Sequence, residues 1–171
     1  MNRINLFVYG SLREGFFNYN KYLANKVIEK KEAKLENMKL YHMPYKGYPA
    51  ITFGEDVVRG EIMVIKEDCY EDTMKAMDEM EGFISENNPE NEYHKVMLEV
   101  ENLHTHQKEK CFVYFYNKDK DSIFDSSTIY IPHGDWKEYM ISGNLQKELS
   151  PNKNILIGMA KEETQESYVY S

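Results

Sequence analysis

The sequence predicts an α+β fold, in which a mixed, partly closed β-barrel carries a few helices on its outside. Strand-like segments broken by turns fill the long stretch from Val27 to Ile65. Only two or three segments have a helical pattern, and they do not alternate regularly with strands, which disfavours a doubly wound sheet. The 171 residues fit one domain, residues 1–171, with a core over about 4–142 and an extension over 150–171 that the pattern does not place.

The first predicted elements surround a glycine-bounded loop. An apolar run over residues 4–9 indicates a buried strand that ends at Gly10, and residues 18–24 indicate a short helix. The loop between them has two glycines spaced as in a P-loop, and its N–H groups are suited to hold an anion. Phe16 and Phe17 stand where a P-loop needs Lys and Ser or Thr, so nucleotide binding is not supported. The alternative is an ordinary strand-ending turn.

Later elements are predicted from similar signals. Gly60, inside an alternating segment, indicates a bulge or a close approach of two backbones. Residues 93–101 and 110–116 have the pattern of paired strands joined by a polar connection. Asp135 is a suitable N-cap for a last helix that runs to about Ser142.

The best-defined helix covers Asp68 to Glu81. Asp68 is suited to cap its start, with Glu71 three residues later in the spacing of a capping box. Gly82 follows where a C′ glycine would end the helix. This helix is therefore expected to have both its start and its end set by local sequence.

Glu81 lies in line with the apolar stripe of that helix. Tyr70, Met74 and Met77 recur at spacings of four and three, and Glu81 comes four residues after Met77. Desolvation, the negative end of the helix dipole and the like charge of Asp78 would each raise the pKa of Glu81. Such a carboxyl group is a good general base near neutral pH. The alternative is a glutamate that turns into solvent or accepts bonds from a neighbouring loop.

Composition and charge narrow the classes of partner. The net charge is −8, and the short Lys and Arg runs are broken by Glu, so nucleic acid is not an expected partner. Cys69 and Cys111 are isolated and form neither a disulfide framework nor a zinc cluster. No signal-type segment or membrane-length apolar stretch is present in the sequence, which predicts a cytoplasmic protein without membrane contact.

Two segments together resemble the γ-glutamylcyclotransferase-like (AIG2-like) family. Residues 9–12, Tyr-Gly-Ser-Leu, match the family's Tyr-Gly-Ser/Thr-Leu signature after the first strand. Residues 77–82, Met-Asp-Glu-Met-Glu-Gly, resemble its Leu-Asp-x-x-Glu-Gly segment with Met in place of Leu. Tyr93 resembles the Tyr that opens the next strand, although Lys95 stands where Arg is common. The resemblance covers about residues 4–142.

The resemblance implies a γ-glutamylcyclotransferase-like fold and a cofactor-independent enzyme with no metal. The substrate would be an L-γ-glutamyl amine or amino acid, whose α-amine attacks the γ-carbonyl and releases 5-oxoproline and an amine. Glu81 would be the general acid and base. The expected substrate-binding residues are Tyr9, Gly10, Ser11, Leu12, Tyr93 and Trp136.

Other interpretations remain open at this stage. One is a non-catalytic module of the same fold that binds a small ligand, and another is an enzyme that removes a γ-glutamyl protecting group in a biosynthetic pathway. His104 and His106 alternate as metal ligands do, but a polar hairpin connection fits them better. Cys111 is expected to be a buried apolar residue, with a Cys–His nucleophile as the alternative.

The remaining expectations concern the rim of the pocket. Arg13 is expected to be a solvated loop residue, or else to attract the substrate α-carboxylate. The leaving amine would be selected at the pocket mouth, by Tyr41, Tyr45, Tyr48 and residues 124–133. The sequence does not determine the substrate or the oligomeric state.

Overall fold

The strands close into a mixed barrel, as the computed structural model, which describes residues 3–148, shows. The ring runs β3-β1-β5-β4-β2 and closes through pairing of β2 with β3, while β6 pairs with β2 outside the ring. The predicted α+β fold with a mixed barrel is confirmed, and the ring is closed rather than partly closed. The strands are β1 (Asn5–Val8), β2 (Val27–Met43), β3 (Tyr48–Ile65), β4 (Tyr93–Asn102), β5 (Lys108–Tyr116) and β6 (Ile129–Ile131).

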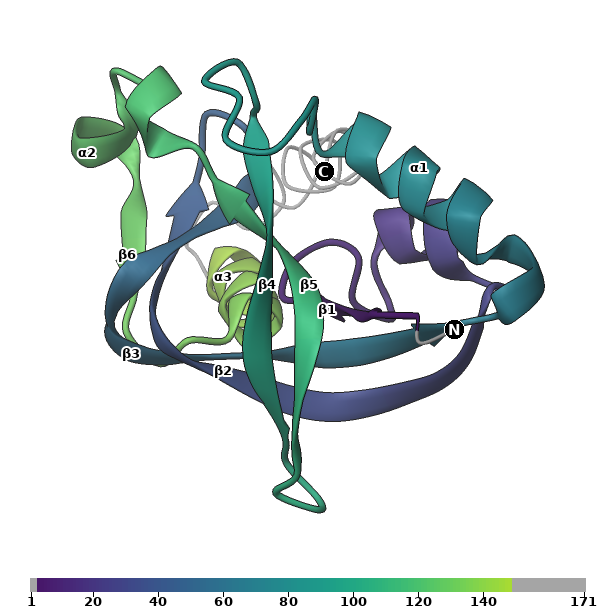
Figure 1. Ribbon diagram of the computed structural model, residues 1–171. Helices are drawn as coiled ribbons and strands as arrows, with labels where there is room; N and C mark the ends of the chain where they lie inside the picture. Colours follow the sequence, from purple (N-terminus) through teal and green to yellow (C-terminus); the bar gives the residue numbers. More distant parts are fainter. Residues whose placement is uncertain (1–2, 149–171) are drawn as a thin grey trace.

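Strand β1 lies between β3 and β5 in this ring. It pairs antiparallel with β3 and parallel with β5, which makes the barrel mixed. Leu6, Phe7 and Val8 are at most 3% exposed, which fits a short apolar run covered on both faces. The chain leaves β1 in the interior of the molecule, so the following turn enters a space enclosed by other strands (Figure 1).

Short helices cover the outside of the barrel. A π-helical segment over Tyr19–Leu23 lies beside α1, on the flank seen at the right of Figure 1. The remaining helices are the 3₁₀ turns Glu67–Cys69 and Lys118–Lys120, α1 (Tyr70–Met80), α2 (Phe124–Ser127) and α3 (Trp136–Glu148). The Oδ1 atom of Asp135 accepts the N–H of Glu138 at 3.0 Å, which confirms Asp135 as the cap of α3. Helix α3 extends beyond the predicted end at Ser142.

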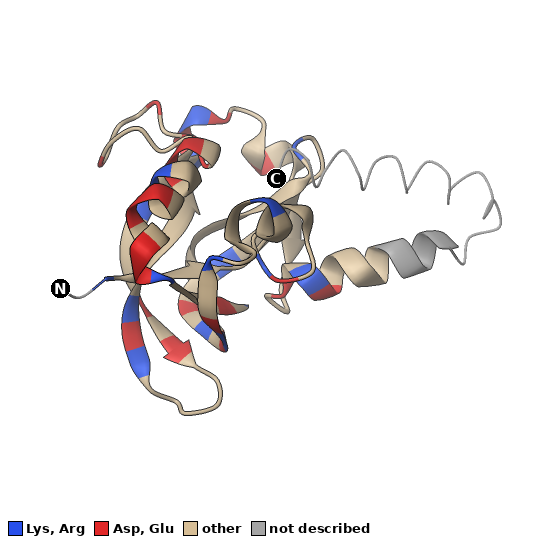
Figure 2. Cartoon of the chain, turned by 90° about the vertical axis from the view of Figure 1, so that its right-hand side faces the viewer, with Lys and Arg blue, Asp and Glu red and all other residues tan. Residues whose placement is uncertain are grey.

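The start of α1 differs from the prediction, whereas its end agrees. A 3₁₀ turn over Glu67–Cys69 leads into the helix, so Asp68 lies inside that turn and does not cap α1. The capping box expected from Asp68 and Glu71 is therefore wrong. At the other end Gly82 has φ of +66°, the left-handed conformation of a C′ glycine. Glu71, Asp72 and Glu79 of α1 are exposed, and the acidic positions of the chain are red in Figure 2.

The buried stripe of α1 packs on one of two apolar clusters. Tyr70, Met74 and Met77 contact the cluster that contains Leu6 and Val8, as the helical spacing predicted. The second cluster contains Phe7, Phe16 and Trp136 and fills the other side of the molecule. Strand β1 therefore contributes residues to both clusters, and the turn that follows it is anchored between them.

Three local predictions can be checked against this fold. His104 and His106 lie in the exposed connection between β4 and β5, which confirms the hairpin. Cys111 is fully buried, and burial raises the pKa of its thiol to about 12, so it is not an activated nucleophile. A Cβ atom at Gly60 would lie 2.1 Å from the carbonyl oxygen of Val8, which confirms a close backbone approach. The β2–β3 register is regular there.

No helix within residues 3–148 is both long enough and apolar enough to cross a bilayer.

Candidate functional site

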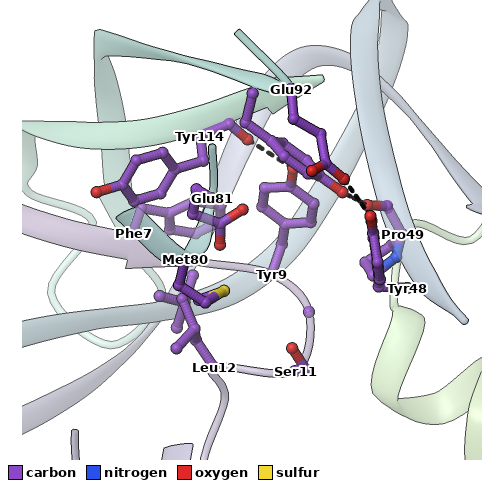
Figure 3. Close-up of a pocket in the computed structure, with 13 residues that line it drawn as sticks. Phe7, Tyr9, Ser11, Leu12, Tyr48, Pro49, Met80, Glu81, Glu92 and Tyr114 are labelled. Atoms are coloured by element: carbon purple, nitrogen blue, oxygen red, sulfur yellow. Dashed lines mark hydrogen bonds between the residues drawn. The ribbon is translucent and has the colours of Figure 1, made fainter. Parts of the chain in front are cut away.

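One cavity of about 80 Å³ lies where β1, α1 and β4 meet. The turn after β1 forms one side of it and the end of α1 a second side, and residues of β1, β5 and the starts of β3 and β4 complete the lining (Figure 3). Its lining residues are Phe7, Val8, Tyr9, Gly10, Ser11, Leu12, Tyr48, Pro49, Met80, Glu81, Glu92, Tyr93 and Tyr114.

The carboxylate of Glu81 faces this cavity (Figure 3). Burial raises its pKa to about 8, and the charges of Glu92 and Asp78 add to the effect. Among residues 3–143, no group donates a hydrogen bond to this carboxylate, so none of them stabilises its anion in this way. The side chain keeps partial exposure because the cavity opens beside it. The predicted rise in pKa is confirmed, with Glu92 as a cause that the sequence did not indicate.

Backbone pairing brings Glu81 next to the start of β4. Beyond the left-handed Gly82, the carbonyl oxygen of Glu81 accepts the N–H of Tyr93 at 3.1 Å. The carbonyl oxygen of Gly82 accepts the N–H of Glu92 at 3.0 Å. Asn91, fully buried, closes the loop between these segments by accepting the N–H of Ile84 at 2.6 Å. The position of Glu81 thus follows from a glycine at a helix end and a tied loop.

The turn after β1 presents backbone donors to the cavity. The N–H of Arg13 donates to the carbonyl oxygen of Gly10 at 3.0 Å, and Asn18 Nδ2 donates to Ser11 Oγ at 3.0 Å. Within the described part of the chain, the N–H groups of Gly10 and Leu12 meet no acceptor. A Cβ atom at Gly10 would lie 2.7 Å from Pro49 Cγ, so the turn requires glycine there. Unpaired N–H groups beside a cavity are suited to bind an oxyanion or a carboxylate.

Arg13 anchors the turn after β1 through two ion pairs and does not line the cavity. Its Nε atom lies 2.8 Å from Glu61 Oε2, and its Nη1 atom lies 2.9 Å from Asp135 Oδ1. The side chains of Arg13 and Glu61 are each 6% exposed, so this is a buried ion pair. Both expectations for Arg13, a solvated residue or a substrate contact, are therefore wrong. The residue links the turn to β3 and to the start of α3.

Four tyrosines line the cavity, and three of them, Tyr9, Tyr93 and Tyr114, are fixed by hydrogen bonds that do not involve Glu92. Tyr9 donates to the carbonyl oxygen of Tyr114 at 2.6 Å, and Tyr93 donates to that of Pro49 at 2.7 Å. Tyr114 donates to Asp78 Oδ1 at 2.6 Å. Burial raises the pKa of Tyr9 and of Tyr93 well above the usual value, so both phenols stay neutral. They shape the cavity, and their protons are committed to other partners.

The cavity brings together most of the residues expected from the sequence. Tyr9, Gly10, Ser11, Leu12 and Tyr93 line it together with Glu81. Tyr48, expected at the mouth, lines it as well, whereas Tyr41, Tyr45 and residues 124–133 do not.

Trp136 is the expected residue that lies elsewhere. Its Nε1 atom donates to His42 Nδ1 at 3.1 Å, and its ring lies 5.1 Å from that of Phe16 in the second cluster. It is fully buried and does not line the cavity, so it is a core residue. An apolar residue at a helix start carries no signal of which side of the barrel it will reach.

Glu92 is the charged lining residue that the sequence did not single out. The one signal available was its position directly before Tyr93, at the start of β4. It lines the cavity next to the residue that follows Glu81, because its N–H donates to the carbonyl oxygen of Gly82. The hydroxyl of Tyr48 donates to its Oε1 atom (Figure 3).

Known proteins are similar to this chain in sequence and in fold. The family described as "Gamma-glutamyl cyclotransferase, AIG2-like" matches residues 6–138. A Niallia circulans protein named gamma-L-glutamyl-butirosin B gamma-glutamyl cyclotransferase is 28% identical over 152 residues, covering 86% of each chain. Among solved structures, an AIG2-like protein from Mus musculus superposes with a TM-score of 0.57 at 20% identity, over 79% of this chain and 88% of that one. An Arabidopsis thaliana protein gives 0.57 at 20% identity, over 84% and 87%. The chain therefore belongs to the AIG2-like γ-glutamyl cyclotransferase family.

Proposed function

We propose that this protein is a γ-glutamyl cyclotransferase that acts on an L-γ-glutamyl amine or amino acid, with Glu81 as its proton-transferring group. The observation that carries the proposal is the cavity in which a carboxyl group with a pKa near 8 lies beside the turn of residues 9–12. Family membership and the activity named for the Niallia circulans relative support the same reaction.

The reaction needs orientation and proton transfer. The α-ammonium of the substrate loses a proton to the Glu81 carboxylate, and the resulting amine attacks the γ-carbonyl carbon of the same molecule. The C–N bond of the lactam forms, and the bond to the departing nitrogen breaks. Two protons pass from the attacking nitrogen to the departing one, so 5-oxoproline and an ammonium leave with no change in total charge. Because the attack is intramolecular, the amine and the carbonyl are already joined, and the cavity needs to hold only the folded conformer in which they meet.

The remaining pocket residues have distinct tasks. The N–H groups of Gly10 and Leu12 bind the oxygen that becomes negative during attack, or the substrate carboxylate. Tyr9 and Tyr93 form walls that fold the glutamyl chain on itself, and Ser11 adds its polar side chain to the same turn. Glu81 works as a relay because its pKa near 8 allows both protonation states near neutral pH.

A panel of γ-glutamyl compounds tests the reaction directly. Purified protein is incubated with γ-glutamyl amino acids, γ-glutamyl alkylamines and γ-glutamylated aminoglycosides, and 5-oxoproline is measured by mass spectrometry. At least one compound is expected to give 5-oxoproline and its free amine in equal amounts. Saturable binding with no 5-oxoproline from any compound would instead identify a non-catalytic binding module of the same fold.

A deprotecting role in a biosynthetic pathway is the second candidate. The Niallia circulans relative is named as the γ-glutamyl cyclotransferase of a conjugate, γ-L-glutamyl-butirosin B. The same chemistry applied to such a conjugate would make this chain a deprotecting enzyme. In the panel, a kcat/KM for γ-glutamylated aminoglycosides well above that for γ-glutamyl amino acids would favour this role.

A further inference from the structure

A second carboxylate, Glu92, lines the cavity that contains Glu81. No Lys or Arg is among the lining residues of the described chain. The γ-glutamyl group carries an α-ammonium, which needs an anionic partner when it leaves water. Glu92 is the group that can supply this charge while Glu81 exchanges protons.

One oxygen of Glu92 is held by the protein and the other is available. The hydroxyl of Tyr48 and Nζ of Lys46, at 3.4 Å, both donate to Oε1. Within residues 3–143, no donor is bonded to Oε2. Lys46 also lies 5.8 Å from the ring centroids of Tyr48 and Tyr116, and it does not line the cavity. Glu92 therefore has a fixed orientation and an unused acceptor.

The backbone fixes Glu92 against the end of α1. Its N–H donates to the carbonyl oxygen of Gly82, one residue beyond Glu81. A Cβ atom at Gly82 would lie 2.9 Å from Glu92 Cβ and 3.5 Å from its Oε2 atom. Gly82 thus does more than end the helix, because any side chain there would displace Glu92. This steric contact places Glu92 next to Glu81 whatever the charges of the two carboxyl groups.

Two carbonyl oxygens in the wall already accept a hydrogen bond. The carbonyl oxygen of Tyr114 accepts the hydroxyl of Tyr9, and that of Pro49 accepts the hydroxyl of Tyr93. A cationic group that enters the cavity therefore meets the two carboxylates as its principal acceptors.

We propose that Glu92 Oε2 binds the α-ammonium of the γ-glutamyl substrate and holds it beside Glu81. This inference rests on the proposed function and names a substrate-binding residue for it. The ammonium placed there also favours the anionic form of Glu81, which is the form that accepts the proton. Glu92 would then select ligands that carry a free α-amine. It would exclude analogues in which the amine is absent or acylated.

The experiment compares two ligands in the Glu81→Gln background, which prevents turnover. The ligands are the γ-butylamide of L-glutamic acid and glutaric acid monobutylamide, which lacks the amine, and their affinities are measured by calorimetry. Glu81→Gln is expected to prefer the first ligand by about tenfold or more, the size of a charge-assisted hydrogen bond. In Glu81→Gln/Glu92→Gln this preference is expected to vanish while the affinity for the glutaryl ligand is unchanged.

Two further variants control for charge and for folding. Glu81→Gln/Glu90→Gln removes an exposed carboxylate two residues away, paired with Lys120, and is expected to keep the preference. Glu81→Gln/Tyr48→Phe removes a bond that orients Glu92 and is expected to reduce the preference partly. The inference would be overturned if the preference for the amine-bearing ligand survives Glu92→Gln. It would also be overturned if Glu92→Gln lowers the affinity for both ligands equally. If the wild-type protein forms no 5-oxoproline and the preference still depends on Glu92, the subsite stands and the proposed reaction does not.

Discussion

Replacement of Glu81 by glutamine is expected to lower kcat/KM for 5-oxoproline formation by about a hundred- to ten-thousand-fold, the usual contribution of general acid–base catalysis. Glutamine keeps the shape and polarity of the side chain but cannot accept or return the proton. The loss should appear mainly in kcat, because the amide still fits the cavity. The measurement is a steady-state assay with the best substrate from the γ-glutamyl panel.

The matched control is Glu79→Gln. Glu79 lies two residues earlier, near the same end of α1, but it is exposed and does not line the cavity. It is expected to retain wild-type activity. If Glu81→Gln turns over substrate at the wild-type rate, Glu81 is not the proton-transferring group.

The pH dependence of stability separates lost chemistry from lost folding in Glu81→Gln. The folded protein keeps the Glu81 proton up to a pKa of about 8, whereas the unfolded chain loses it near 4.5. Between these values the folded state binds more protons, so the free energy of unfolding falls as the pH rises. Glutamine avoids this cost and is expected to stabilise the protein by about 2 kcal/mol at pH 8, after allowance for partial exposure, and by almost nothing near pH 4.5. Urea denaturation at both pH values measures the difference.

Replacement of Arg13 by methionine is expected to destabilise the protein by about 3 kcal/mol. The change leaves Glu61 buried without its cation, and it also removes the contact to Asp135. Because Arg13 fixes the turn that supplies the Gly10 and Leu12 N–H groups, activity should fall as well. Chemical denaturation at neutral pH gives the change in the free energy of unfolding.

Lys30→Met provides the comparison for this ion pair. Lys30 pairs with Glu14 at the surface, where the side chains are 33% and 56% exposed. Such a pair contributes at most about 1 kcal/mol, so little change is expected. The double variant Arg13→Met/Glu61→Met should recover part of the lost stability, since the buried charge of Glu61 is removed together with its partner and Asp135 keeps the N–H of Glu138. If Arg13→Met and Lys30→Met have equal effects, the buried pair does not have the role described here.

The parts of this account that could be predicted from sequence are local or periodic. The strand-rich segment of β2 and β3 and the stripe of α1 both follow from spacing, and the stripe placed Glu81 toward the core. The end of α1 at Gly82 could be predicted because the left-handed position strongly favours glycine. The start of α1 could not, since a 3₁₀ turn and an N-cap compete for the same acidic residues.

What could not be predicted depends on contacts between distant segments. Arg13 finds Glu61 48 positions away and Asp135 122 positions away, and nothing near Arg13 indicates burial. Glu92 joins Glu81 only because a tied loop folds back on the end of α1. Trp136 was expected to line the pocket but lies in the core. Its aromatic character fits both places equally well until the topology is known.

The pKa of the Glu81 carboxyl group is the quantity on which the account depends most. It can be measured by following the side-chain ¹³C carboxyl shift of Glu81 through a pH titration, with Glu81→Gln to assign the signal. The account predicts a pKa near 8 in the wild-type protein and a lower value in Glu92→Gln, where the neighbouring charge is absent. A wild-type pKa between about 4 and 5, the range of a solvated glutamate, would contradict it.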